Sequence, residues 1–294
     1  CCSGAAAKAL AFHIGDNSNV SSSGWDPSCS ATSDTGVGRG EWSHVAVRVY
    51  AVGNFLAVDF FIDGDNAGTT TNIYGSINIG NLPSDESSPT LMLGRTNYCD
   101  ELADGYTAER GCFKYFGYMD GVRLWNTNLT DDTIASRSSE LAYPFHPNVD
   151  DLLFEYTFDS APAGAVALDG SLNARHATVQ MCNGMCDPRD TRSSAENVVF
   201  DKSTFSKNDR ALVFDGDTRY EIDGPDAATA FAPLAALTFD AWVYPEGTSD
   251  GGEMLASYGA GFEGWGVMLM CKTPGMPWCC ASGSHVEGSI GFFA

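Results

Sequence analysis

The sequence predicts an all-β protein, built as a sandwich or barrel from many short strands. Residues 44–50 carry a valine at every second position, and residues 55–62 alternate in the same way. Residues 63–66, with the sequence Asp-Gly-Asp-Asn, follow as a turn between two strands. The 32 glycines and 12 prolines separate further short apolar runs. Short strands at this spacing are typical of sandwiches and barrels.

Further strands and one helix are predicted along the chain. The helix is expected near residues 130–141, because Thr130 can cap it and two aspartates occupy its first turn. Pro144 lies beyond its end. The remaining strand-like runs are residues 90–93, 116–125, 152–158, 211–214, 237–244 and 265–270.

The charge balance excludes two classes of partner. Against 16 basic residues stand 38 acidic ones, so the formal net charge of the 294-residue chain is −22. Such a surface repels nucleic acid and anionic lipid headgroups, and it attracts dissolved cations such as calcium. The sequence has no apolar run near the roughly 18 residues of a membrane span, so direct membrane insertion is not expected.

The ten cysteines favour disulfide bonds over a zinc site. Only Cys182 and Cys186 have a spacing close to that of zinc ligands, and they lack a matching second pair. Disulfides predict an extracellular location, and two glycosylation sequons, at Asn19 and Asn128, agree with it. We expect Cys99 to pair with Cys112, and we leave the other pairings open. The remaining cysteines are Cys1, Cys2, Cys29, Cys271, Cys279 and Cys280.

The two ends of the chain look alike. Residues 1–13 and 279–294 each read as Cys-Cys, a loop of small residues and a short apolar strand. A repeat of 279 − 1 = 278 residues would explain the likeness, and chance would also explain it. The proline-containing segment 143–150 is the predicted linker.

Residues 41–136 resemble the second half of a laminin-G-like domain of the concanavalin A-like lectin/glucanase superfamily. The resemblance rests on the Trp-x-His-Val-Ala motif from Trp42, on Asp63-Gly64, and on Gly117-x-x-Asp120-x-Val-Arg-x-Trp125. Residues 152–270 resemble the first half of such a domain. The matching stretches there are residues 153–159, 169–173, 211–216, 237–245 and 264–267.

This resemblance implies an antiparallel jelly-roll sandwich with its halves in reversed order. In one interpretation the chain is part of a tandem array, in which residues 1–145 finish one domain and residues 151–294 begin the next. In the other interpretation both halves close one permuted sandwich. Half a sandwich exposes an apolar face, so each half needs a complement in either case.

The resemblance also implies a structural calcium ion, with Asp159, Asp169, Asn173 and Asp120 as ligands. The same residue types form turns, so the two interpretations stay open. Glucanases of the superfamily need alternating carboxylates on a strand, and the nearest match starts at Glu221. A Gly-Pro break interrupts it, so we expect no catalytic site. Serine-nucleophile, Walker and Rossmann motifs do not occur in the sequence.

Glycan binding is the other property that the resemblance implies. Trp25, Tyr98, Tyr106 and Trp278 lie in loop-like contexts and are the candidate contacts, although they could equally serve subunit contacts. We therefore expect a non-catalytic extracellular structural or adhesive protein, which contacts copies of itself head to tail and builds a filament, matrix or cell-surface assembly. The alternative is a carbohydrate-binding module, with glycans or matrix proteins as partners. A divergent glycoside hydrolase is the third and weakest interpretation.

Overall fold

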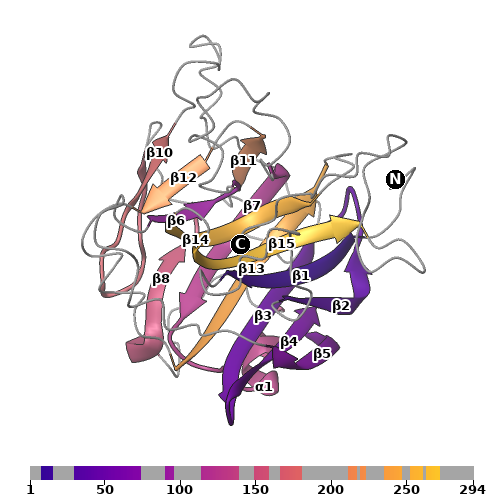
Figure 1. The fold of residues 1–294 in the computed structure, drawn as a ribbon. Coiled ribbons are helices and arrows are strands. Elements are labelled where there is room, and N and C mark those ends of the chain that lie inside the picture. Colours follow the sequence, from indigo (N-terminus) through magenta and orange to yellow (C-terminus); the bar gives the residue numbers. More distant parts are fainter. Residues whose placement is uncertain are drawn as a thin grey trace, which may run out of the picture.

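The protein folds into two antiparallel β-sheets that pack face to face, with one short helix on the outside (Figure 1). This architecture confirms the predicted β-sandwich. The structure is a computed structural model, and it describes residues 8–15, 30–73, 90–95, 114–138, 149–158, 166–180, 211–216, 219–222, 235–246, 252–260 and 263–271.

One sheet has eight strands in the described part of the chain. Their order is β2-β1-β15-β14-β6-β12-β10-β9, and every neighbouring pair is antiparallel. The strands are β1 (Lys8–Gly15), β2 (Ser30–Val37), β6 (Thr90–Leu93), β9 (Val166–Ala167), β10 (Ala177–Gln180), β12 (Arg219–Ile222), β14 (Glu253–Ala260) and β15 (Glu263–Cys271).

The other sheet has seven described strands and carries the functional features discussed below. Its order is β11-β7-β13-β3-β4-β5, and β8 also pairs with β7. The strands are β3 (Ser43–Val52), β4 (Phe55–Ile62), β5 (Asp65–Ile73), β7 (Phe116–Trp125), β8 (Leu152–Tyr156), β11 (Leu212–Asp215) and β13 (Ala236–Pro245).

Both sheets combine strands from the first and second parts of the chain. β13 lies between β3 and β7, and β15 pairs with β1 along its whole length. The two segments that resemble half-domains therefore hydrogen bond to each other within one chain. The tandem array and the linker at residues 143–150 stay predictions, and residues 139–148 lie outside the described part.

The core between the sheets is built from alternate residues of each strand. Val45, Val47 and Val49 are fully buried there, as the valine pattern predicts. Phe239 on β13 packs into the same cluster with no exposed surface. Truncating such a buried ring to alanine typically costs about 3–5 kcal/mol, so the core fixes which face of each strand points outward.

The predicted strands are all present, but the helix is shorter than expected. α1 spans Asp131–Arg137, and the Thr130 side chain accepts a hydrogen bond from the Thr133 backbone N–H as its N-cap. Ser138 caps the other end, so the helix stops earlier than residue 141. Polar β5 was missed because its alternation is weak, with exposed threonines at 69 and 71.

α1 covers part of the outer face of the seven-stranded sheet. Ile134 packs with Ala46, Phe61 and Trp125 in a second buried cluster beneath the helix. The turn at Gly64, which has a φ of 88°, approaches the helix so closely that a Cβ there would lie 3.1 Å from the Ala135 Cα. This end of the outer face is therefore closed to solvent.

Among the described residues, no helix is long and apolar enough to cross a membrane.

Candidate functional site

The outer face of the seven-stranded sheet carries rows of large side chains across β7, β13 and β3. Alternation along β13 places Leu237, Phe239, Ala241 and Val243 in the core, so the intervening residues point outward. The register then sets their neighbours on β7 and β3. From one end to the other the rows are Tyr118–Tyr244–Trp42, Asp120–Trp242–His44, Arg123–Asp240–Ala46 and Trp125–Thr238–Arg48.

The first row, Tyr118, Tyr244 and Trp42, is aromatic and half-buried, and we call it the aromatic row. Tyr118 and Tyr244 are directly opposite each other, with ring centroids 5.7 Å apart and nearly perpendicular planes. The Trp42 ring lies 5.6 Å from Tyr244 and 6.4 Å from Tyr118, so all three rings contact one another. Such contacts between aromatic rings are favourable and hold the three rings in place.

The backbone around the aromatic row is fastened from both sides. Gly40 donates its N–H to the Pro245 carbonyl at 2.9 Å, and Glu246 donates its N–H to the Phe116 carbonyl at 2.9 Å. Gly117 has a φ of 141° and approaches β13 so closely that a Cβ would lie 2.1 Å from the Tyr244 carbonyl oxygen. Only glycine fits that position, so the sequence builds a rigid base for the rings.

The second row explains the spacing of the Gly-x-x-Asp-Gly-Val-Arg motif. Asp120 and Arg123 are three residues apart, which would point them to opposite faces of a regular strand. A register shift between Asp240 and Trp242 marks an irregularity at this point, and Gly121 adopts a φ of 54° there. Asp120 and Arg123 consequently both reach the outer face.

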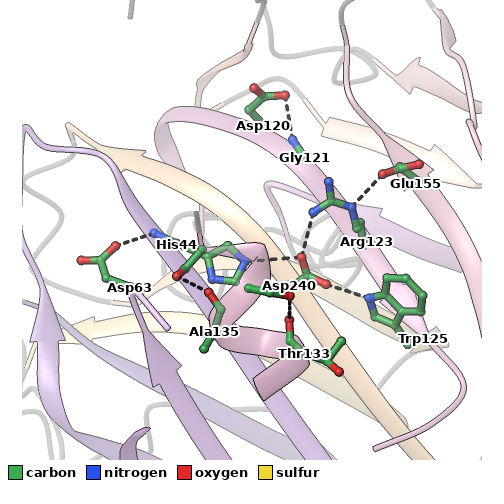
Figure 2. Close-up of polar contacts among 12 residues, drawn as sticks. His44, Asp63, Asp120, Gly121, Arg123, Trp125, Thr133, Ala135, Glu155 and Asp240 are labelled. Carbon is green, nitrogen blue, oxygen red and sulfur yellow. Dashed lines mark hydrogen bonds and ion pairs between the residues drawn. The ribbon is translucent and has the colours of Figure 1, made fainter. Parts of the chain in front are cut away.

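The third row centres on Asp240, which is completely buried and accepts three polar contacts (Figure 2). Trp125 donates its indole N–H to Oδ2 at 2.7 Å, and Arg123 donates from Nη1 to Oδ1 at 3.1 Å. The His44 Nε2 lies 3.5 Å from the same Oδ1. Arg123 also donates from Nε to Glu155 Oε1 at 2.7 Å, so one guanidinium links two carboxylates.

These contacts keep Asp240 ionised despite its burial. Burial alone would raise the pKa of this carboxyl, but the His44 contact and the charge of Arg123 outweigh it and hold the pKa well below its ordinary value. Burial likewise opposes the charge of Arg123, and Asp240 and Glu155 reverse that effect, so its pKa is raised. The opposite charges of Asp240 and Arg123 therefore stabilise each other inside the network.

The network also connects the sheet to α1. The Arg137 guanidinium, which is on the helix, lies 4.3 Å from the Trp125 ring centroid. Arg48 donates from Nη2 to Asp59 Oδ2 at 2.6 Å, and from Nη1 to the Leu129 carbonyl at 2.7 Å. Both Asp240 and Glu155 are bonded to a guanidinium, so neither carboxylate has the environment of a general acid or base. The second, third and fourth rows thus hold the strands of the outer face in position.

The predicted calcium ligands are used for internal hydrogen bonds where the structure describes them. Asp169 accepts from the backbone N–H groups of Glu155, Ser171 and Arg175 at 2.7–2.8 Å. Asn173 donates its amide to the Leu152 carbonyl at 2.7 Å. Among the described residues, no group of three His, Cys, Asp or Glu side chains is placed to hold a metal. Asp159 lies outside that part, so the calcium site stays a prediction.

Most of the other predicted site residues also lie outside the described residues. Cys271 ends β15, and Asn128 is exposed before α1. Glu221 pairs with Arg219 on β12, so this carboxylate already has a cation partner. Not described are Asn19, the aromatic candidates Trp25, Tyr98, Tyr106 and Trp278, and Cys1, Cys2, Cys29, Cys99, Cys112, Cys182, Cys186, Cys279 and Cys280.

Comparison with protein families supports the fold. A family model described as "Concanavalin A-like lectin/glucanases superfamily" matches residues 4–135. Residues 4–135 are therefore similar to domains of this superfamily. Laminin-G-like domains of the superfamily are usually non-catalytic binding modules and are commonly extracellular. Comparisons with curated proteins and with solved structures gave no significant match.

The superfamily match covers part of the aromatic row. Trp42 and Tyr118 lie inside residues 4–135, whereas Tyr244 comes from β13, beyond the match. The sequence pattern assigns Trp42, Trp125, Trp242 and Trp265 to packing, and the last three are indeed buried. Trp42 is half-buried instead, and it directly precedes β3. Strand alternation alone could not distinguish it from the others.

Proposed function

We propose that this protein is a non-catalytic extracellular binding module that holds a glycan against the aromatic row. The observation that carries this proposal is the contact of three half-buried rings in one row of the outer face. The C–H groups of a sugar ring pack well on aromatic faces, and fixed rings lose little conformational entropy on binding. Arg39, Glu41 and Glu246 are exposed, lie within three residues of Trp42 or Tyr244 in sequence, and carry hydrogen-bonding groups.

The proposal is tested by screening the full chain against immobilised glycans, with Trp42→Ala and Tyr244→Ala as variants. Loss of a central aromatic contact typically costs about 2 kcal/mol or more, or about 30-fold in affinity. Tyr50→Ala is the matched control, since Tyr50 is a half-buried ring on the same face that contacts Arg48. Binding that survives both aromatic-row substitutions would contradict the proposal.

The finer role that we propose is adhesion or assembly, in which copies of the module contact each other head to tail. The ten cysteines and the similar segments at residues 1–13 and 279–294 support a repetitive, disulfide-linked protein. In such an assembly the glycan-binding face would decorate an extracellular filament, matrix or cell-surface structure. Matrix proteins are then further candidate partners.

Denaturing electrophoresis of native material, with and without reductant, tests the array. A reduced species far above 31.3 kDa would support a covalent tandem array. A reduced species near 31.3 kDa would contradict it, and would leave a discrete glycan-binding subunit.

A further inference from the structure

We infer that the glycan held by the aromatic row carries free, positively charged amino groups. The inference rests on the proposed glycan-binding function and adds the chemical class of the ligand. Aromatic rings present a negative π-face, which attracts a cation in addition to the C–H groups of a sugar. Three contacting rings at one surface therefore suit an amino sugar better than a ligand that has only hydroxyl groups.

Two glutamates lie close in sequence to rings of the row. Glu41 directly precedes Trp42, and Glu246 follows Tyr244 by two residues; both glutamates are exposed. Asp120 belongs to the adjacent row and is opposite Trp242. The two exposed glutamates would attract an ammonium group bound at the rings, whereas Asp120 is buried.

The described segments that form the row contain a single basic side chain. Within residues 38–42, 115–120 and 242–246, Arg39 is the only Lys or Arg, against Glu41, Asp120 and Glu246, so the local formal charge is 1 − 3 = −2. Arg39 donates from Nε to the Glu246 carbonyl at 2.9 Å, which ties it to the strand end. The formal charge of these segments therefore favours a cationic ligand over an anionic one.

The whole molecule adds to this preference. Its formal net charge of −22 attracts a polycationic glycan from a distance and repels a sulfated or carboxylated one. Long-range attraction does not select one site on the surface over another. Selective binding at this site must therefore come from the rings and the nearby glutamates. Added salt should weaken the long-range part first.

The test measures the affinity of the full chain for three probes of equal length by calorimetry. The probes are hexamers of β-1,4-linked glucosamine, N-acetylglucosamine and glucose, which share a backbone and differ in charge. We expect the glucosamine hexamer to bind about fivefold or more tightly than the other two. Its advantage should shrink as the salt concentration rises.

Variants separate the ring contribution from the charge contribution. Trp42→Ala should weaken binding of every probe, whereas Glu41→Gln with Glu246→Gln should abolish the preference for glucosamine and leave the uncharged probes bound. Asp150→Asn is the matched charge control, because Asp150 is an exposed carboxylate on the short 3-10 helix Val149–Asp151, outside the row. The control should bind like the wild type.

Three other outcomes would overturn the inference. Equal or tighter binding of an uncharged hexamer would contradict the amino-sugar preference and leave the proposed glycan function intact. Glucosamine binding that Trp42→Ala does not change would show nonspecific attraction to the acidic surface. If the chain binds none of the probes, the amino-sugar ligand is excluded, and a further failure in the wider glycan screen would remove the proposed function as well.

Discussion

At the scale of single residues, Asp240 determines whether the outer face can form. Asp240 is completely buried, and its carboxylate oxygens accept hydrogen bonds from the Trp125 indole and the Arg123 guanidinium. The positive charges of Arg123 and Arg137 stabilise its negative charge. A buried pair of this kind need not add net stability, but removing one partner leaves an uncompensated charge. The sequence could not reveal this role, because Asp240 stands in a strand motif without any partner nearby in the chain.

Asp240→Asn should therefore lower the free energy of unfolding by about 3–5 kcal/mol at neutral pH. The measurement is chemical denaturation, with the exposed Asp150→Asn as control and an expected change within about 0.5 kcal/mol. An unchanged denaturation midpoint for Asp240→Asn would contradict the role of the network.

The same variant gives a pH prediction with a definite sign. The folded pKa of Asp240 is lowered, so its charge stabilises the fold at every pH above the unfolded pKa and that contribution is lost as the pH falls. The stability difference between wild type and Asp240→Asn should accordingly be constant at neutral pH and narrow below about pH 4. A difference that widens on acidification would contradict this assignment.

At the scale of elements, the sequence predicted the strands and the helix start that depend on neighbouring residues in the chain. β4 runs from Phe55 to Ile62 as its alternation predicts, and Thr130 caps α1 as expected. β5, β9, β10, β12 and β14 carry weaker patterns and depend on their neighbours in the sheet. The aromatic row depends on the register of three strands that are far apart in sequence, so alternation could assign Trp42 only to packing.

The N-cap of α1 allows a test at this scale. Thr130→Ala should destabilise the protein by about 1 kcal/mol, because it removes the acceptor for the Thr133 N–H. Thr130→Ser keeps the hydroxyl and should stay close to wild type in thermal denaturation. Equal losses for the two variants would show that the methyl group, and not the cap, matters.

At the scale of the whole molecule, the two parts of the chain complete each other's sheets. β13 supplies the strand between β3 and β7, and its Tyr244 completes the aromatic row begun by Trp42 and Tyr118. Residues 4–135 match the superfamily model, but this region alone lacks the strand β13 that lies between β3 and β7. The resemblance to two half-domains indicated that each half needs a complement, and it left open where that complement lies.

Separate production of residues 1–145 and 151–294 tests this interdependence. Neither fragment should unfold cooperatively by itself, since each would expose an apolar face and unpaired strand edges. Mixing the fragments under oxidising conditions should restore the near-UV circular dichroism of the intact chain. Cooperative unfolding of one isolated fragment would contradict the view that the two parts form one folding unit.

Hydroxyl-radical footprinting of the intact chain, with and without a glycan that it binds, tests whether the aromatic row is the binding surface. The aromatic-row account predicts that oxidation of Trp42, Tyr118 and Tyr244 falls on binding, while Tyr50 on the same face is oxidised at an unchanged rate. Unchanged oxidation of the three rings at saturating glycan would contradict it and would place the binding surface elsewhere.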